Sequence, residues 1–346
     1  MPSVQVVVPD DYPVAYGGPD HPQLRRLAEY GTVTVHASRW ADRDDLFRRL
    51  APADVVINVR AYTVFDDEAL AHAPNLKLIS ILGTGTDNVD LEAATRRGVV
   101  VTNTPGIGAL PVAELALALM MATVRPIVVM DRRLRAGLWQ HEIGPELYGK
   151  ALGLLGLGAI AQHFARIGNG LGMRVIGWSF RHDPERAADC GVELVERDEV
   201  FRRADVVSVH LRNSPEARGF VGRRELAMMK PTAVLINTAR AAIVDQDALV
   251  EALRERKILG AGLDVHAQEP LPVEANPFKD LDNVVLTPHV GGSTTEGILR
   301  SRKMPVDNII AFLEGRPEYV VNPAVLRRRA GPTPAARRRQ RSGESG

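Results

Sequence analysis

Short runs of β-branched residues alternate with amphipathic stretches along nearly the whole chain, and this alternation constrains the fold more than any other feature. Strands separated by helices are typical of parallel sheets whose faces are covered by helices. A chain of 346 residues exceeds what one hydrophobic core usually holds. The strand candidates form two series, residues 4–8, 32–35, 54–59, 76–82 and 98–102 in the first, and 151–156, 173–178, 205–210, 233–238, 260–265 and 284–289 in the second. We therefore predict an α/β protein with two doubly wound parallel-sheet domains.

The segments around the second series indicate how the two domains are connected. "LPVAELALALMMATV" (110–124) is apolar on every face, so we expect a helix buried between domains or at a subunit contact. "STTE" (293–296) has the pattern of a capping box that opens a helix through Phe312. "EYVVNP" (318–323) could then return the chain to the first domain. The predicted domains are residues 1–103 with 293–326, and 104–292, followed by a basic disordered tail at 327–346.

Charge and cysteine content bear on the class of function. The tail carries seven arginines and one glutamate, which leaves 36 basic and 41 acidic side chains in the rest of the chain. This mildly acidic body gives no electrostatic reason to expect nucleic acid as a partner, although the tail alone could tether it. The single cysteine, Cys190, excludes an internal disulfide and a thiolate cluster, and we expect no metal site. We found no signal peptide and no apolar run of membrane-spanning length, so we expect a cytoplasmic protein without a membrane partner.

A glycine-rich loop follows the first strand of the second series. "LLGLGAIA" (154–161) places Gly156 and Gly158 between that strand and the start of a helix, which is the context of a dinucleotide-binding turn. Gly156 would allow the tight turn and Gly158 the close approach of a pyrophosphate, while small Ala161 would let the helix pack on the strand. The first N–H groups of that helix, at Ala159 and Ile160, would bind phosphate oxygens. The alternative is a tight turn without a ligand.

The end of the next strand bears on the choice of cofactor. NAD-binding proteins carry an acid here for the ribose hydroxyls, but this chain has Ser179, with Arg181 and Asp183 beyond it. Without a carboxylate there is no repulsion against a 2′-phosphate, and Arg181 could pair with one. Arg181 could equally be a solvated loop charge. We therefore expect NAD or NADP, with the preference open.

Three ionisable side chains follow the last three strands of the second series. Arg240 follows "AVLINTA", Glu269 follows "GLDVHAQ" and His289 follows "VVLTP". Ligands of open parallel sheets bind beyond the carboxyl ends of the strands, so these residues should converge where a nicotinamide would lie. Taken singly, each has an ordinary structural role, as an ion pair, a loop charge or a hydrogen-bond donor to carbonyls. Together they predict an active site.

The ordered set of motifs resembles the D-isomer-specific 2-hydroxyacid dehydrogenase family over about residues 4–326, within it the phosphoglycerate dehydrogenase and glyoxylate-hydroxypyruvate reductase branches. The resemblance implies a Rossmann NAD(P)-binding domain inserted in a flavodoxin-like substrate domain. The matching stretches are "GTGTDNVDLEAATRRGVVVTNTPG" (83–106), "VAELALAL" (112–119), "GLLGLGAIA" (153–161), "ADVVSVHL" (204–211), "MKPTAVLINTARAAIVD" (229–245), "GAGLDVHAQEP" (260–270) and "NVVLTPHVGGST" (283–294).

What the resemblance implies can be carried over residue by residue. Arg240 would bind the carboxylate of a 2-keto acid, His289 would act as general acid in reduction and base in oxidation, and Glu269 would hydrogen-bond His289. Asp264 is expected near the nicotinamide carboxamide. The further cofactor contacts implied are Val112, Thr238, Ala239 and Gly291, and the implied substrate contacts are Arg60, Gly83, Thr84 and Gly85.

Departures from the family pattern limit the function to be expected. Arg212 and Ala241 replace a usual proline and glycine, and Ile81 stands where the phosphoglycerate branch has a second anchor for the anionic group. We therefore expect an NAD(P)-dependent dehydrogenase of small 2-keto or 2-hydroxy acids such as glyoxylate or hydroxypyruvate, more than of 3-phosphoglycerate. Glu269 disfavours formate oxidation. The alternative from another class is an NAD(H)-sensing binding protein of corepressor type. A homodimer is expected, built around residues 112–124.

Overall fold

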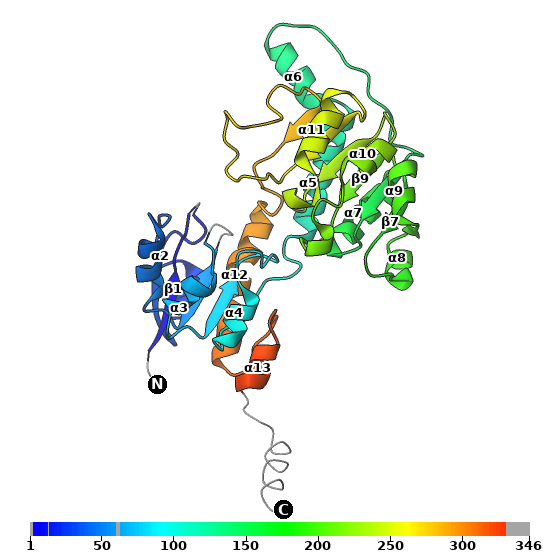
Figure 1. Cartoon of the computed structure of the whole chain (residues 1–346). Coiled ribbons are helices and arrows are strands. Elements are labelled where there is room, and N and C mark those ends of the chain that lie inside the picture. The colour runs from blue at the N-terminus through cyan, green and yellow to red at the C-terminus, as the bar shows by residue number, and fades with distance from the viewer. Residues whose placement is uncertain (1–2, 13, 60–62, 330–346) are drawn as a thin grey trace, which may run out of the picture. The chain divides into compact units, whose positions relative to one another are not determined.

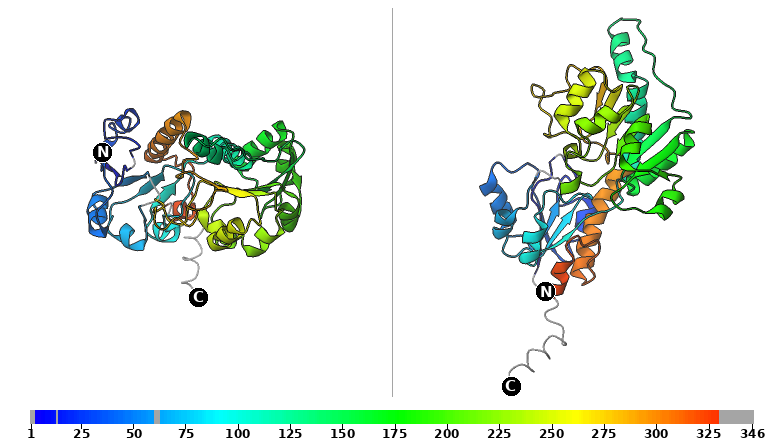
Figure 2. Two further views of the ribbon diagram at one scale, coloured as in Figure 1. Left: turned by 90° about the horizontal axis from the view of Figure 1, so that it is seen from above. Right: turned by 45° about the vertical axis from the view of Figure 1, so that its right-hand side comes forward.

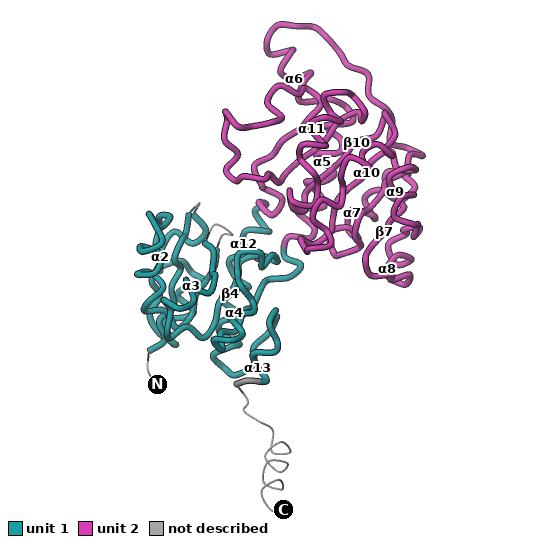
Figure 3. The backbone as a smooth tube through the Cα atoms, viewed as in Figure 1, with its two compact units in different colours: residues 1–107, 295–346 teal, residues 108–294 magenta. Residues whose placement is uncertain are grey.

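The computed structural model describes residues 3–12, 14–59 and 63–329, and it divides the chain into two compact units (Figure 3). Unit 1 is Met1–Ile107 with Thr295–Gly346, and unit 2 is Gly108–Thr294. Unit 2 therefore interrupts the sequence of unit 1. Of the predicted tail, residues 330–346 lie outside the described residues.

The described part of unit 1 contains a five-stranded sheet with the order β2-β1-β3-β4-β5, whose neighbouring strands are parallel. This is the flavodoxin-like order, in which the direction of winding reverses between β1 and β3. Apolar residues fill both faces of β3 and β4, as expected for strands covered by helices on both sides. The strands are β1 Val4–Val8, β2 Gly31–Val35, β3 Val55–Asn58, β4 Leu78–Ile81 and β5 Val100–Thr102.

Helices cover both faces of this sheet. Three of them begin where an aspartate accepts a main-chain N–H of the first turn, at Asp42, Asp66 and Asp90. These are α2 Arg43–Leu50, α3 Asp67–Ala71 and α4 Leu91–Arg96, which pack their apolar residues into one core. The opposite core is formed with α1 Pro22–Arg25, α12 Thr295–Leu313 and α13 Ala324–Arg329.

The C-terminal segment returns to unit 1, as the sequence suggested. Val320 forms an antiparallel bridge with Thr102, and the N–H of Val321 donates to Val101 O at 2.9 Å. Asn322 is buried, and its Oδ1 accepts the N–H of Val101 at 2.9 Å while its Nδ2 donates to Val99 O. The end of the described chain is thus tied to the edge strand β5.

Unit 2 contains, among its described residues, a seven-stranded parallel sheet with the order β12-β11-β10-β9-β6-β7-β8. The chain winds from β6 outward to β8, then returns to β9 beside β6 and winds the other way to β12. This is the Rossmann order with one added strand, and its switch point lies between β6 and β9. The strands are β6 Ala151–Leu155, β7 Arg174–Trp178, β8 Glu193–Leu194, β9 Val206–Val209, β10 Val234–Asn237, β11 Gly260–Leu263 and β12 Val284–Leu286.

Two cores lie on opposite faces of this sheet, and Figure 2 shows the helix layers on its two sides. On one face α5 Ala109–Val124 packs beside α7 Ala159–Gly170. On the other face lie α9 Arg197–Arg203, α10 Arg223–Met228 and α11 Gln246–Arg254. Short α8 Pro184–Asp189 lies beside β8.

The segment after α5 differs from the rest of unit 2. Helix α6 Ile127–Arg135 contains no buried residue, and together with the following loop it projects from the body of unit 2 (Figure 1). We call residues 125–148 the arm. Its exposed apolar side chains are Ile127, Leu134, Leu138, Trp139, Ile143 and Tyr148.

The fold predicted from the sequence is confirmed, and the two strand series match β1 to β5 and β6 to β12 except for the two-residue strand β8. The apolar helix was predicted to be buried between domains or at a subunit contact, and a subunit contact stays a prediction. Much of α5 is buried within unit 2 itself, against β10, β11 and α7. Among the described residues no single helix combines the length and hydropathy of a membrane span, whereas α5 and α6, bent by 62°, reach that threshold together.

Candidate active site

The candidate catalytic residues follow three adjacent strands of unit 2. Arg240 follows β10, Glu269 follows β11 and His289 follows β12, and these strands pair in parallel register. Their carboxyl ends therefore lie along one edge of the sheet. This confirms the placement of the strand ends on which the sequence prediction depended.

Glu269 and His289 form a hydrogen-bonded pair. His289 Nδ1 lies 2.7 Å from Glu269 Oε2, and the main-chain N–H of His266 donates to Glu269 Oε1 at 3.0 Å. Burial raises the pKa of the Glu269 carboxyl, but the hydrogen bonds from His289 and His266 outweigh burial and hold that pKa below its usual value. An ionised Glu269 can only accept, so Nδ1 of His289 carries a proton. Nε2 is then the ring nitrogen able to exchange a proton with a ligand.

The loop that carries His289 is anchored by Asp264, which is 1% exposed. Asp264 Oδ1 accepts the hydroxyl of Thr287 at 2.6 Å and the N–H of Val290 at 2.9 Å, and its Oδ2 accepts the N–H of Gly291 at 2.9 Å. His289 itself has a φ of 55°, in the left-handed region that β-carbon-bearing residues rarely adopt. The carboxylate thus fixes the loop on both sides of a residue in an unfavourable conformation.

Arg240 lies in a turn that Asn237 closes. Asn237 is buried at the end of β10; its Oδ1 accepts the N–H of Ala239 at 3.0 Å, and its Nδ2 donates to Arg240 O at 3.0 Å. Nη1 of Arg240 donates to Ala239 O at 2.8 Å. Asn237 can therefore fix the backbone from which a half-buried guanidinium extends.

The glycine loop has the geometry of a phosphate-binding turn. Gly156 has a φ of 96°, and a β-carbon there would lie 2.8 Å from His210 O, so a larger residue is excluded. Gly158 is exposed at the start of α7, where no side chain among the described residues caps the first turn. The N–H groups of Ala159 and Ile160, in that first turn, can therefore bind an anion.

The predicted ribose-binding position follows β7. Ser179 is half-buried and Arg181 is exposed. Asp183 is engaged elsewhere, because it caps α8 by accepting the N–H of Arg186 and also pairs with the Arg186 guanidinium at 3.2 Å. The acid nearest in sequence to this strand end is thus committed to the local fold.

Two further features fit a dinucleotide. Thr238 Oγ1 is buried and has no hydrogen-bond partner among the described residues, as a group reserved for a ligand would be. Val112, near the start of α5, faces Gly291, where an added β-carbon would lie 2.9 Å from Val112 Cγ2. Together with the glycine loop, these features fit a nicotinamide cofactor along the carboxyl edge of the sheet.

The predicted substrate residues of unit 1 follow β4. The N–H of Gly83 donates to Thr104 Oγ1 at 2.8 Å, so in this structure that donor is occupied within the protein. The hydroxyl of Thr84 donates to Thr104 O at 3.3 Å, and Gly85 is half-buried. Arg60, the remaining substrate candidate, lies outside the described residues.

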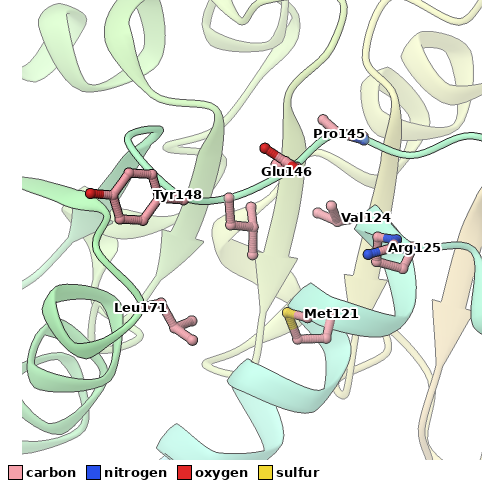
Figure 4. A pocket seen from close by; sticks show the side chains of 8 residues that line it. Met121, Val124, Arg125, Pro145, Glu146, Tyr148 and Leu171 are labelled. Atoms are coloured by element: carbon pink, nitrogen blue, oxygen red, sulfur yellow. The ribbon is translucent and has the colours of Figure 1, made fainter.

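The described residues contain no group of three His, Cys, Asp or Glu side chains arranged to hold a metal ion. A pocket of about 360 Å³ in unit 2 lies elsewhere, between the end of α5 and the arm (Figure 4). Its lining residues are Met121, Val124, Arg125, Pro145, Glu146, Leu147, Tyr148 and Leu171. None of these is a predicted site residue.

Sequence reasoning did not single out His266 and Asn237, which contact the predicted catalytic residues directly. Asn237 carried a signal, because an asparagine at a strand end often closes a turn. His266 stands three residues before Glu269, within reach of its carboxylate, but nothing in the sequence shows that its ring contacts a different loop.

Comparisons with known proteins agree with this geometry. Residues 117–291 match the family model described as "D-isomer specific 2-hydroxyacid dehydrogenase, NAD binding domain". The chain is 40% identical over 294 residues to the glyoxylate reductase of Thermococcus litoralis, covering 82% of this chain and 88% of that protein. It is 38% identical over 303 residues to the D-3-phosphoglycerate dehydrogenase of Methanocaldococcus jannaschii, covering 86% of this chain and 57% of that protein.

The solved structures include similar folds. The D-lactate dehydrogenase of Aquifex aeolicus, complexed with NAD and lactic acid, matches with a TM-score of 0.81 at 25% identity. The match covers 92% of this chain and 99% of that one.

Proposed function

The chain belongs to the D-isomer specific 2-hydroxyacid dehydrogenase family, whose members are oxidoreductases that use a nicotinamide cofactor, and we propose that it reduces a small, unphosphorylated 2-keto acid. Glyoxylate and hydroxypyruvate are the substrate class we favour. The observation that carries this proposal is the Glu269–His289 pair, which lies at the strand edge that also carries Arg240. A cation that binds a carboxylate and an imidazole that exchanges a proton are the two groups this reaction needs.

The proposed mechanism assigns one task to each side chain. The nicotinamide, when bound, supplies or accepts the hydride. Arg240 binds the substrate carboxylate through its guanidinium, a planar donor that matches the two oxygens. His289 donates a proton from Nε2 to the substrate oxygen during reduction and removes it during oxidation. Glu269 accepts the Nδ1 proton of His289 in a hydrogen bond, so the ring keeps its orientation.

The preference for an unphosphorylated acid rests on the end of β4. Ile81 is the last residue of that strand and is 4% exposed within the core of unit 1. It therefore offers no donor or charge to a distal phosphate. This supports glyoxylate or hydroxypyruvate over 3-phosphoglycerate, although relatives named for each activity are similar to the chain.

We further propose that NADPH is preferred over NADH. Ser179 brings no negative charge to the end of β7, and Asp183 is held by the first turn of α8 and by Arg186. Arg181 is exposed in the same loop and forms no ion pair among the described residues. A 2′-phosphate would therefore meet a guanidinium without a competing carboxylate.

A substrate panel tests this proposal. Glyoxylate, hydroxypyruvate, pyruvate and 3-phosphohydroxypyruvate are each assayed with NADPH and with NADH. We expect the highest kcat/KM for an unphosphorylated acid with NADPH. His289→Gln should lower kcat by a factor of about 100 or more, as expected for loss of a general acid, with little change in cofactor affinity. Cofactor binding without turnover of any acid would refute the proposed activity and favour a nucleotide-sensing protein.

The proposed oligomer is a homodimer joined by the arm. An amphipathic helix normally buries its apolar stripe, yet α6 buries none of its residues. Trp139 is 88% exposed and Ile143 93% exposed, which is unusual for large apolar side chains close together in one segment. In a twofold dimer each arm can be covered by the same surface of the other copy. This moves the proposed contact from α5, where the sequence suggested it, to the segment that follows.

A further inference from the structure

His266 contacts Glu269 and the loop that carries His289, although it is neither member of the proposed catalytic pair. Its main-chain N–H donates to Glu269 Oε1 at 3.0 Å. Its ring Nε2 lies 2.9 Å from the main-chain oxygen of Thr287, which belongs to the loop that carries His289. His266, in the loop after β11, is therefore hydrogen-bonded both to the carboxylate of its own loop and to the neighbouring loop after β12.

These bonds close a circuit. It runs from the His266 N–H to Glu269, from Glu269 Oε2 to His289 Nδ1 at 2.7 Å, and through the backbone to Thr287 O and the ring of His266. When one hydrogen bond of a closed network is removed, the remaining bonds can lengthen or change direction. Such a network therefore contributes more to stability than the same number of isolated hydrogen bonds. The orientation of the Glu269–His289 pair thus depends on the His266 ring.

The chemistry of the acceptor fixes the form of the ring. A carbonyl oxygen only accepts, so Nε2 of His266 must carry the proton. Nδ1 of His266 is buried and has no hydrogen-bond partner among the described residues. The ring therefore donates from Nε2 alone. A replacement side chain can take this role only if it places a donor as far from Cα as Nε2 is.

The position of the acceptor explains why such a donor is needed. His289 adopts a left-handed φ of 55°, which costs a residue with a β-carbon about 1–2 kcal/mol. Asp264 holds the N–H groups of Val290 and Gly291 on the far side of His289, together with the hydroxyl of Thr287. None of these bonds involves the carbonyl of Thr287, two residues before His289. Among the described residues, the ring of His266 is the group that donates to this carbonyl.

We propose that His266 is a positioning residue that aligns Glu269 with His289, holding Glu269 by its main-chain N–H and the His289 loop by its ring. The inference rests on the proposed function, because the alignment matters to catalysis only if His289 exchanges a proton with the substrate. It assigns no contact between His266 and substrate or cofactor.

Three substitutions of the full-length protein test the role of Nε2. His266→Phe keeps a flat ring and removes the donor. His266→Gln places an amide nitrogen as many bonds from Cα as Nε2, whereas in His266→Asn the side chain is one bond too short. We expect kcat to fall about tenfold in the Phe and Asn variants, the cost of a hydrogen bond in a positioned network, and to recover to within about threefold in the Gln variant. The cofactor Kd should stay within about twofold of wild type.

A matched control removes a similar bond elsewhere. His72 in unit 1 also binds a carbonyl through its ring, with Nδ1 3.0 Å from Glu68 O, so His72→Phe controls for loss of a ring-to-carbonyl bond. It should leave kcat unchanged. A Gln variant as slow as the Asn variant, or a Phe variant as fast as wild type, would overturn the proposal. If the Phe variant does not fold, the ratio of Gln to Asn rates decides alone.

A readout without turnover separates this inference from the proposed activity. Nitrogen-15 NMR of histidine side chains should show His266 protonated at Nε2 and a strongly downfield Nδ1 proton on His289. That proton should move upfield in His266→Phe and recover in His266→Gln. If wild type shows these signals but turns over none of the acids tested, the proposed activity is refuted and the positioning role still holds. An unchanged His289 signal in His266→Phe would refute the positioning role.

Discussion

Oδ2 of Asp264 accepts the main-chain N–H of Gly291 at 2.9 Å, and a β-carbon on residue 291 would lie 3.1 Å from the same oxygen. The same β-carbon would lie 2.9 Å from Cγ2 of Val112 on α5. Gly291 is therefore closely packed between a buried carboxylate and a helix. This contact links the apolar helix to the loop that carries His289, within one unit.

Gly291→Ala should test this packing. The added methyl group must displace Val112 or Asp264, and overpacking of this kind costs about 1–3 kcal/mol of the free energy of unfolding. We expect a lower midpoint in urea unfolding and a lower kcat, because Asp264 holds the loop. Val112→Ala in the same chain should restore part of the stability, since it removes the closer contact. Equal stability of Gly291→Ala and wild type would show that the loop moves freely away from α5.

Glu269→Gln should shift the pH dependence of reduction. The pKa of Glu269 is held below its usual value by the bonds from His289 and His266, against the effect of burial, so the carboxylate persists into acidic solution. Its stabilising contribution is present above the usual carboxyl range and is lost as the pH falls through the lowered pKa. Gln keeps an acceptor for the Nδ1 proton of His289 but has no carboxyl group that could be protonated as the pH falls.

We therefore expect the acidic limb of the kcat profile for reduction, which in wild type follows protonation of Glu269, to be absent in Glu269→Gln. The exposed Glu274, in the same loop, provides the control variant Glu274→Gln, which should leave the profile in place. An acidic limb that persists unchanged in Glu269→Gln would contradict a role for the ionised carboxylate.

His210 should make the cofactor-free protein less stable in acid. Burial lowers the pKa of His210 to about 3, its Nδ1 is enclosed, and its Nε2 lies 2.9 Å from Ser208 Oγ. The unfolded chain binds a proton at this residue below about pH 6.5, whereas the folded chain does not until about pH 3. As the pH falls across this window, the free energy of unfolding therefore decreases by up to about 1.4 kcal/mol per pH unit.

Urea unfolding of the cofactor-free protein between pH 7.5 and pH 4 measures this slope. His210→Gln should have a shallower slope than wild type, whereas His141→Gln, at an exposed position of the arm, should have the wild-type slope. Parallel slopes for wild type and His210→Gln would mean that His210 does not contribute to the acid dependence.

The sequence predicted those parts of the fold and site that follow from periodicity and local pattern. Alternating strand and helix signals gave both parallel sheets, and the motifs gave the family. The glycine loop could be located because a positive φ at Gly156 requires glycine, whatever the rest of the fold. Strand ends placed Arg240, Glu269 and His289 at one edge because parallel strands end together.

Contacts between loops could not be predicted in the same way, because they depend on tertiary packing. The oxygens of Asp264 accept hydrogen bonds from the His289 loop, which the sequence did not indicate, and its place near the nicotinamide stays a prediction. The N–H of Gly83 donates to Thr104, which is distant in sequence, and the role of Gly83 in substrate binding stays a prediction. Nothing in the local sequence reveals that a donor is already occupied.

The arm offers a prediction about assembly. If the exposed side chains of Trp139 and Ile143 are covered by a second copy, replacing both with serine should dissociate the dimer, because burial of large apolar groups drives association. Sedimentation velocity should show wild type as a dimer and Trp139→Ser/Ile143→Ser as a monomer at micromolar concentration. Leu299→Ser, at an exposed apolar position of α12 in unit 1, should remain dimeric. A monomeric wild type would rule out the proposed contact.

The loop after β7 allows a direct test of cofactor choice. Ser179→Asp would place a carboxylate beside the ribose, where it repels a 2′-phosphate and can accept the hydroxyls of NADH. We expect the ratio of kcat/KM for NADPH to that for NADH to fall at least about tenfold. Arg181→Gln should lower the same ratio by reducing the NADPH term alone. Glu185→Gln, at an exposed position of nearby α8, should leave the ratio unchanged. Wild type with a marked preference for NADH, or an unchanged ratio in Ser179→Asp, would show that another part of unit 2 selects the cofactor.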